Sequence, residues 1–307
     1  MPQINSRDME PSPVMSASMG EEEAMKRIQL EYLFEDKPYV EGDTLPDYDS
    51  LDVVSHGCHL YGEILWPDGA RPRPCVILFH GFPGSARNDD LAHALCRVGC
   101  VVLTPHHRGA WGSEGEYLVS NCVEDAVILA NYVRRAEFVR QYHADPDNIY
   151  LIGHSMGGNT VLHAARELPW LRGIVLLTPF DPTRHLRDGR EDLLLRLLEQ
   201  GTPLRSRGVD GMLRDIVSHQ ESFCFASAFE DLRDQNLLCI TGKSDQCAPA
   251  EQMFLPLWEK LQAYGSGAVQ RFLELPAGHG LLGCRSALIQ AVAQFLADTL
   301  CEHQFQS

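Results

Sequence analysis

Basic side chains and long apolar runs are both scarce in this chain of 307 residues. Lys and Arg number 26 against 42 Asp and Glu, which gives a formal net charge of −16. A field of that sign favours solubility and repels phosphate backbones, so nucleic acid is not an expected partner. No apolar run approaches the ~20 residues that a membrane-spanning helix needs, and the N-terminus lacks the basic and apolar regions of a secretion signal. We therefore expect neither a membrane span nor export.

Metal, redox and phosphate motifs are missing as well. None of the ten cysteines lies in a CxxC pair, and the histidines show neither HExxH nor HxH spacing, the patterns of zinc and dithiol sites. The Gly-rich turn GHSMGG continues with Asn159 and Thr160 instead of GK[ST], so it is not a phosphate loop. We expect no cofactor and no metal. Cys75, Cys100 and Cys239 lie in apolar runs and are interpreted as buried thiols of a reduced, cytoplasmic protein.

Wholly apolar segments alternate with helical patterns through most of the chain. Only a sheet covered on both faces has strands without an apolar and polar alternation. The pattern therefore predicts an α/β fold with a mostly parallel central sheet and helices on both faces. Segments 26–36 and 58–67 do alternate, which predicts a leading antiparallel hairpin. The buried strands are expected at 75–79, 100–105, 148–153, 173–179, 236–242 and 268–276.

Two regions depart from this rhythm. Residues 1–25 mix Pro, Ser, Met and acidic residues without periodicity and are expected to form a disordered tail. Residues 180–235 replace the next strand by Leu- and Arg-rich helical segments, which predicts a helical cap inserted into the sheet. The core is then built from residues 26–179 and 236–307.

The strongest chemical signal is Gly-His-Ser-Met-Gly around Ser155, at the junction of a predicted strand and a predicted helix. This G-x-S-x-G pattern puts a serine on a strained turn that its neighbouring glycines make possible, with its hydroxyl exposed above the strand end. Ser155 is therefore the candidate nucleophile.

A second glycine-rich turn, HGFPG, follows the strand predicted at 75–79. Fixed backbone N–H groups stabilise the negative charge that develops on a carbonyl oxygen during nucleophilic attack. We assign this oxyanion hole to the N–H groups of Phe82 and Met156, because Pro83 has no N–H to donate.

Asp245 and His279 each follow a predicted strand of the parallel sheet. The carboxyl ends of such strands meet at one edge, where open α/β sheets gather their ligands. The chain order Ser155, Asp245, His279 is the order of a nucleophile, an orienting acid and a general base in this type of fold. Asp181, which follows another predicted strand, stays open as an alternative acid.

These motifs resemble those of α/β-hydrolases, nearest the prolyl-oligopeptidase-like and serine-aminopeptidase-like esterases. The resemblance is carried by GHSMGG, HGFPGS, RGAWGSEG and the loops of Asp245 and His279, and it covers about residues 55–301. It implies the α/β-hydrolase fold and a Ser-His-Asp triad. These families include carboxylesterases, acylglycerol lipases and peptidases, so the substrate stays open, and the propeller domain of true prolyl oligopeptidases is absent.

Three aromatic residues are candidates for substrate binding. Trp111, in the RGAWG loop, is a possible wall of the acyl pocket. Phe225 and Phe229 lie in an aromatic stretch of the expected cap, where they either line the pocket or bury the cap against the sheet.

The expected function is that of a serine hydrolase that cleaves carboxylic esters through an acyl-enzyme intermediate, with a small-molecule ester or amide as substrate. An aminopeptidase or amidase with the same triad is an alternative, in which Glu221, Glu230 or Asp231 would anchor a terminal ammonium. A binding protein that kept the fold and lost the chemistry is a further alternative, which the complete set of three residues disfavours.

Overall fold

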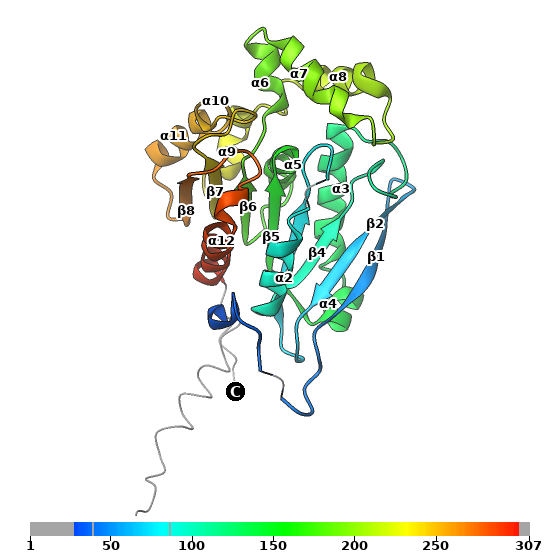
Figure 1. Cartoon of the computed structure of the whole chain (residues 1–307), viewed down its shortest axis with the longest axis vertical. Helices are drawn as coiled ribbons and strands as arrows, with labels where there is room; N and C mark the ends of the chain where they lie inside the picture. Colours follow the sequence, from blue (N-terminus) through cyan, green and yellow to red (C-terminus); the bar gives the residue numbers. More distant parts are fainter. Residues whose placement is uncertain (1–27, 39, 86, 301–307) are drawn as a thin grey trace, which may run out of the picture.

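The computed structural model describes residues 28–38, 40–85 and 87–300, and these form an eight-stranded sheet (Figure 1). The strand order is β1-β2-β4-β3-β5-β6-β7-β8. β2 runs antiparallel to β1 and β4, and all other neighbours are parallel. The strands are β1 Asp47–Ser55, β2 Cys58–Trp66, β3 Arg73–Phe79, β4 Val101–Pro105, β5 Ala144–His154, β6 Gly173–Leu177, β7 Leu237–Gly242 and β8 Gln270–Leu275.

Burial along the strands explains their sequence patterns. Every residue of β3, β4, β6 and β7 is buried, which is why these segments are apolar without alternation. At the edge of the sheet, β1 alternates exposed and buried residues toward its end. The expected α/β fold with a mostly parallel sheet is confirmed.

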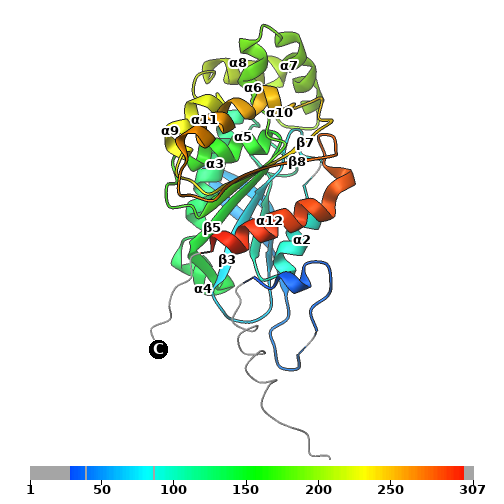
Figure 2. The ribbon, with the colours of Figure 1, turned by 90° about the vertical axis from the view of Figure 1, so that its left-hand side faces the viewer.

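Helices cover both faces of the sheet (Figures 1 and 2). α2 (Asp89–Arg97) and α12 (Arg285–Thr299) pack on one face. α3 (Val119–Tyr132) and α5 (Met156–Ala165) pack on the other. The remaining helices of the core are α4 Ala136–Tyr142, α10 Ala250–Met253 and α11 Leu255–Tyr264, with the 3-10 turn η4 at Leu282–Cys284.

Residues 180–235 form helical turns and no strand, and α6 to α8 stand above the end of the sheet where β5 leads into α5 (Figure 1). The buried carboxylate of Asp215 ties this region to α3, because it accepts hydrogen bonds from the N–H and the hydroxyl of Ser120 at 3.1 and 2.6 Å. The elements are α6 Pro182–Arg187, α7 Glu191–Leu198, η2 Glu199–Gly201, α8 Gly208–Ser218, η3 Phe225–Ala228 and α9 Phe229–Leu232.

The leading hairpin differs from the prediction. The antiparallel partner of β2 is β1, and the described part of residues 26–36 carries only the 3-10 turn η1 (Leu30–Tyr32). The guanidinium of Arg97 at the end of α2 donates hydrogen bonds to the carbonyls of Tyr32 and Leu33, at 2.8 and 2.6 Å. This contact holds the segment against α2 instead of the sheet edge. The expected tail at residues 1–25 lies outside the described residues.

Candidate active site

Ser155 stands between the end of β5 and the first residue of α5. Its backbone has φ 56° and ψ −118°. Residues other than glycine rarely adopt this conformation, and its presence indicates backbone strain of the kind found at functional turns. The turn also needs Gly157, because a Cβ there would lie 2.5 and 2.6 Å from the carbonyl oxygens of Phe79 and His80. The strained backbone presents the Ser155 hydroxyl above the strand end.

His279, in the loop after β8, faces that hydroxyl. Its Nε2 lies 2.8 Å from Ser155 Oγ, and its Nδ1 lies 2.8 Å from Oδ2 of Asp245. An ionised carboxylate only accepts hydrogen bonds, so in the neutral form of the imidazole Nδ1 carries the proton and Nε2 is free to accept the serine proton. Burial by itself would lower the pKa of His279, but the hydrogen bond to Asp245 and the neighbouring Cys247 together raise it to about 9.

Asp245, in the loop after β7, is buried and fully bonded. Its Oδ1 accepts the N–H groups of Cys247 and Ala248 at 2.9 and 2.8 Å, while Oδ2 accepts His279 Nδ1–H. Burial alone would raise the pKa of this carboxyl, but the bonds to His279 and to the two backbone groups lower it below its usual value. The acid therefore stays ionised beside the histidine.

The HGFPG loop lies directly against the serine. A Cβ on Gly81 would come within 2.9 Å of Ser155 Cβ, so only glycine allows this approach. The Phe82 ring lies 5.6 Å from that of Tyr117 and packs under Gly201 of the helical insertion. Met156 is the first residue of α5, and its N–H is among the helix-end donors that have no intrahelical acceptor. Phe82 follows Gly81 in the chain and Met156 follows Ser155, so both assigned residues adjoin the close contact between the loop and the serine turn.

Trp111 belongs to the RGAWG loop, which lies beside the HGFPG loop. Its side chain is 44% exposed, and its indole N–H donates to the carbonyl of Pro83 at 3.1 Å. The neighbouring Arg108 is tied to the buried carboxylate of Asp125 at 2.7 Å. These contacts fasten the RGAWG loop to the HGFPG loop and to α3.

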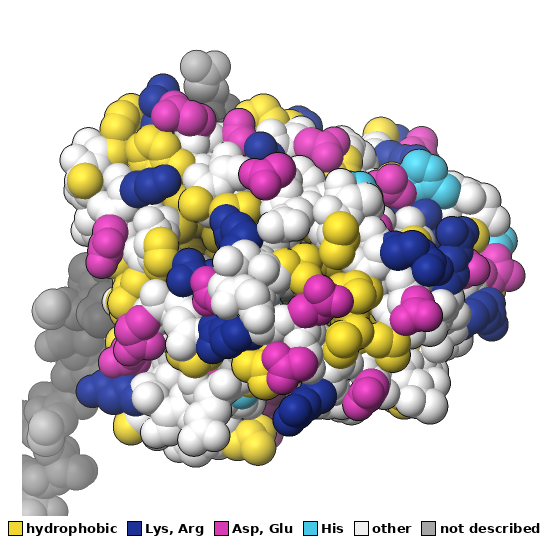
Figure 3. Space-filling model, turned by 90° about the horizontal axis from the view of Figure 1, so that it is seen from above, with side chains coloured by type: hydrophobic (Ala, Val, Ile, Leu, Met, Phe, Trp, Pro, Cys, Tyr) yellow, Lys and Arg dark blue, Asp and Glu magenta, His cyan; other side chains and the backbone are white. Residues whose placement is uncertain are grey.

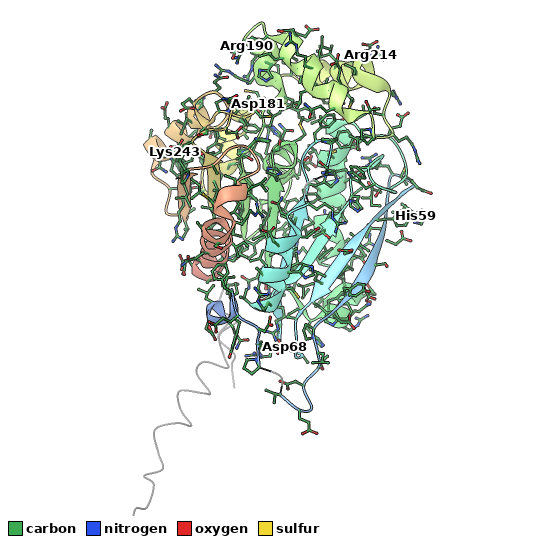
Figure 4. All side chains as sticks on the ribbon, in the orientation of Figure 1. His59, Asp68, Asp181, Arg190, Arg214 and Lys243 are labelled. Carbon is green, nitrogen blue, oxygen red and sulfur yellow. The ribbon has the colours of Figure 1, made fainter. Side chains whose placement is uncertain are left out.

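Asp181 does not meet His279. The residue lies at the base of α6, between the helical insertion and the core (Figure 4). Its carboxylate accepts hydrogen bonds from Thr183, from the backbone N–H of Phe225 and from Arg187 at 3.0 Å. Of the two candidate acids, Asp245 is the one within hydrogen-bond distance of the histidine.

Phe225 and Phe229 lie within the packed base of the insertion. Phe225 is 1% exposed and its ring stands 6.1 Å from that of His163 on α5. Phe229 is half-buried, with its ring edge-on to Tyr264 of α11 at 6.1 Å. Phe225 is therefore a core residue, and Phe229 packs against the core from a partly exposed position.

Two residues that sequence reasoning passed over also reach the site. His154 Nε2 and Thr178 Oγ1 lie 3.1 and 3.0 Å from the backbone carbonyl of His279. Their only sequence signal is position, because each stands at the carboxyl end of a buried parallel strand.

The clearest apolar cavity of the described residues lies at the other end of the molecule, around Asp68 (Figure 4). It encloses about 380 Å³ between the segment before β1 and α2. Lys37 binds Asp68 at 2.6 Å in this lining, and Arg97 binds carbonyl oxygens. The cavity is therefore separate from the site around Ser155.

Within the described ranges, no group of three or more His, Cys, Asp or Glu is arranged to hold a metal ion. None of the helices in those ranges has the length and apolar character needed to cross a membrane. The face seen from above mixes acidic, basic and hydrophobic side chains (Figure 3).

Comparison with known proteins places this arrangement in a family. The model of the serine aminopeptidase S33 family matches residues 70–221, which include the HGFPG loop and Ser155. The chain has the α/β-hydrolase fold. The fold of this α/β hydrolase is also that of Est1E from Butyrivibrio proteoclasticus, with a TM-score of 0.62 at 16% identity over 81% of this chain and 98% of that one. An esterase from Pyrococcus furiosus gives a TM-score of 0.61 at 15% identity, over 87% and 98%.

Curated relatives of this α/β hydrolase match over shorter segments. A mouse protein named monoglyceride lipase is 30% identical over 116 residues, which are 37% of each chain. Esterase EstD of Thermotoga maritima is 28% identical over 178 residues, which are 51% of this chain and 40% of that protein. The chain thus spans less than half the length of these relatives.

Proposed function

We propose that this α/β hydrolase cleaves small-molecule carboxylic esters through an acyl-enzyme intermediate. Ser155 is the nucleophile, His279 the general base and Asp245 the acid that orients the histidine. The observation that carries the proposal is the continuous pair of 2.8 Å contacts from Ser155 Oγ through the imidazole to the Asp245 carboxylate. The activity needs no cofactor.

The reaction takes two steps on the same residues. Ser155 Oγ bonds to the ester carbonyl carbon as its proton passes to His279 Nε2, and collapse of the tetrahedral intermediate breaks the ester C–O bond while His279 returns the proton to the leaving alcohol. Water then gives a proton to His279 and attacks the acyl carbon, and the second collapse releases the acid and restores the serine hydroxyl.

The oxyanion of each intermediate is assigned to the N–H groups of Phe82 and Met156. The close approach of Gly81 to Ser155 and the position of Met156 at the first turn of α5 support this assignment. Donors fixed by the fold lower the barrier because they need no reorganisation as charge develops.

Ester cleavage is preferred because relatives of the chain carry the names monoglyceride lipase and esterase.

We also propose that residues 180–235 act as a cap over the site. The packing of Gly201 against the Phe82 ring supports this role, because it brings the insertion to the oxyanion loop. Trp111 and the half-buried Phe229 remain candidates for the pocket walls, while Phe225, 1% exposed, packs as a core residue.

An aminopeptidase is the second candidate, given the name of the matching family. Such an enzyme needs a carboxylate free to hold the substrate ammonium. Asp231 is paired with Arg166 at 2.7 Å, and Glu230 is paired with Arg233 at 2.7 Å. These pairings occupy two of the three candidate anchors and leave the exposed Glu221 as the remaining one. The complete hydrogen-bonded triad disfavours a binding protein without activity.

A reducing, cytoplasmic compartment is part of the proposal. Its support is that the nine cysteines among the described residues are free thiols, the usual state where glutathione and thioredoxin act.

A fluorophosphonate probe followed by ester profiling tests the function. The wild type is expected to be labelled, and Ser155→Ala is expected to resist labelling and to lose turnover by several orders of magnitude, as His279→Ala does. p-Nitrophenyl esters of increasing acyl length and aminoacyl anilides are then compared by kcat/KM. Faster cleavage of the anilides would show that the aminopeptidase, and not the esterase, is the function. Labelling of Ser155→Ala would overturn the mechanism.

A further inference from the structure

The backbone carbonyl of His279 is held by two side chains from the sheet. Thr178 Oγ1–H donates to it at 3.0 Å and His154 Nε2–H donates at 3.1 Å. The donors come from adjacent strands, since His154 ends β5 and Thr178 follows directly on β6, and His154 pairs with Leu177 in the ladder. Two donors on one carbonyl use both lone pairs of that oxygen.

His154 acts here as a neutral donor. A carbonyl oxygen only accepts, so Nε2 must carry the proton. Its Nδ1 is buried and has no partner among the described residues, which leaves Nε2–H as the functional end of the ring. Burial lowers the pKa of His154 to about 4, so no second positive charge stands beside the imidazolium that forms during the reaction.

Thr178 is held in a conformation that its side chain disfavours. Its φ is 41°, in the left-handed region, where a β-branched residue is an outlier. Such strain persists where the surrounding structure over-determines it, and it often serves a functional geometry. The backbone N–H of Thr178 bonds to the Ile240 carbonyl at 2.7 Å, so the residue is fixed from both its backbone and its side chain.

The same strand end also holds the serine. The N–H of Ser155 donates to the Leu177 carbonyl at 2.9 Å, one residue before Thr178. The backbones of the nucleophile and of the base are therefore both tied to the end of β6. Because both backbones are tied to the same strand end, their separation is fixed, and with it the 2.8 Å contact between Ser155 Oγ and His279 Nε2.

We propose that Thr178 and His154 are positioning residues that clamp the backbone of His279 so that its ring bridges Ser155 and Asp245. The clamp rests on the proposed function, in which His279 is the general base. It adds a role for the strained Thr178 and for the histidine that precedes the nucleophile. Because neither residue touches the substrate in this scheme, their loss changes kcat and leaves KM nearly unaltered.

Substitutions at Thr178 test the clamp. Thr178→Val keeps the shape and removes the donor, so kcat is expected to fall ~10- to 100-fold, the usual effect of a misplacement of about 1 Å. Thr178→Ser restores the donor and most of the turnover. Thr241→Val is the matched control, because this buried threonine lies one residue before the end of neighbouring β7 and its hydroxyl has no partner among the described residues; its kcat is expected to stay within about twofold of wild type.

Substitutions at His154 give an independent arm. His154→Leu removes the donor and lowers kcat, while His154→Gln offers an amide N–H in place of Nε2–H and recovers part of it. His163→Leu is the control, since His163 is another buried neutral histidine, bonded to the Phe223 carbonyl at 2.9 Å. Its loss is expected to lower the melting temperature without changing the kcat of the folded enzyme. Thr178→Val with His154→Leu is expected to lose less than the product of the single losses, because both act on one acceptor.

Proton NMR separates the clamp from the proposed function. The His279 Nδ1–H proton, bonded to Asp245, is expected to give a downfield signal that broadens or moves upfield in Thr178→Val and stays in Thr178→Ser and Thr241→Val. If the fluorophosphonate fails to label the wild type, the proposed function fails and this signal still tests the clamp. If the wild type is labelled while Thr178→Val and His154→Leu keep both wild-type kcat and the signal, the clamp alone is overturned.

Discussion

Oδ2 of Asp245 lies 2.8 Å from Nδ1 of His279, although 34 residues separate the two in the chain. They meet because β7 and β8 are parallel neighbours, and the loops that follow these strands start at the same edge of the sheet. The relationship distinguishes Asp245 from Asp181, whose carboxylate is occupied by Thr183, Arg187 and a backbone N–H.

The two acids are expected to respond differently to the same substitution. Asp245→Asn removes the charge that fixes the tautomer of His279, so kcat is expected to fall by about 10⁴-fold. Asp181→Asn instead weakens the bonds that anchor the insertion and is expected to cost ~1–3 kcal/mol of unfolding free energy. Urea denaturation and kcat per titrated active site measure the two effects. A large loss of kcat in Asp181→Asn with little change in Asp245→Asn would move the orienting role to Asp181.

The pH dependence of kcat/KM is expected to follow His279. The protonated imidazole cannot accept the Ser155 proton, so activity falls as the pH falls through the pKa of this group. Because Asp245 and the neighbouring Cys247 raise that pKa from 6.5 to about 9, the acid limb lies above 6.5. In Asp245→Asn the acid limb of the residual activity is expected at lower pH. A profile of kcat/KM from about pH 5 to about pH 10, which extends to both sides of the pKa, detects this difference. A limb in the wild type below 6.5 would contradict the coupling.

The same shift predicts a pH effect on stability. A raised folded pKa means that His279 contributes stability that is fully present below pH 6.5 and is lost as the pH rises through about 9. Unfolding free energies of Ser155→Ala, measured across this window, are expected to fall with rising pH. His279→Ala, which lacks the group, should show a smaller fall; equal slopes would show that other groups dominate.

Phe225→Ala is expected to destabilise the protein rather than to change its substrate preference. The ring is 1% exposed and belongs to the main core, so its loss should cost ~3–5 kcal/mol. Phe229→Ala, at a half-buried site, should cost less. Thermal denaturation beside a series of ester chain lengths separates the roles. An altered chain-length preference with an intact melting temperature would assign Phe225 to the pocket.

Gly81→Ala is expected to inactivate a folded protein. The new Cβ would lie 2.9 Å from Ser155 Cβ and from the His154 carbonyl oxygen, so the oxyanion loop has to move away from the nucleophile. Fluorophosphonate labelling should slow ~100-fold or more, the usual effect of losing oxyanion donors. Gly267→Ala is the control, because a Cβ there has no atom within 4 Å. If Gly81→Ala is labelled at the wild-type rate, the HGFPG loop does not form the oxyanion hole.

The sheet and the elements that carry the site could be predicted from the sequence because the signals are local. Continuous apolar strands such as β3 and β6 reveal burial on both faces, and G-x-S-x-G at a strand end indicates a strained serine turn. The prediction of a strand at 26–36 was wrong because the alternation in this segment is a local signal, whereas its position depends on a distant residue. Arg97 binds its carbonyl groups and holds it against α2.

The sequence by itself determined the parallel sheet, the strand-to-helix turn at Ser155 and the order of the three candidate catalytic residues, because each strand and each motif is recognised from a short local segment of the chain. Only the tertiary structure decided that Asp245 and not Asp181 meets His279, and that His154 and Thr178 bond its carbonyl. These relationships join loops that are far apart in sequence, and a hydrogen bond formed across 101 or 125 residues leaves no periodicity in the chain. The register of the parallel strands brings those partners within reach.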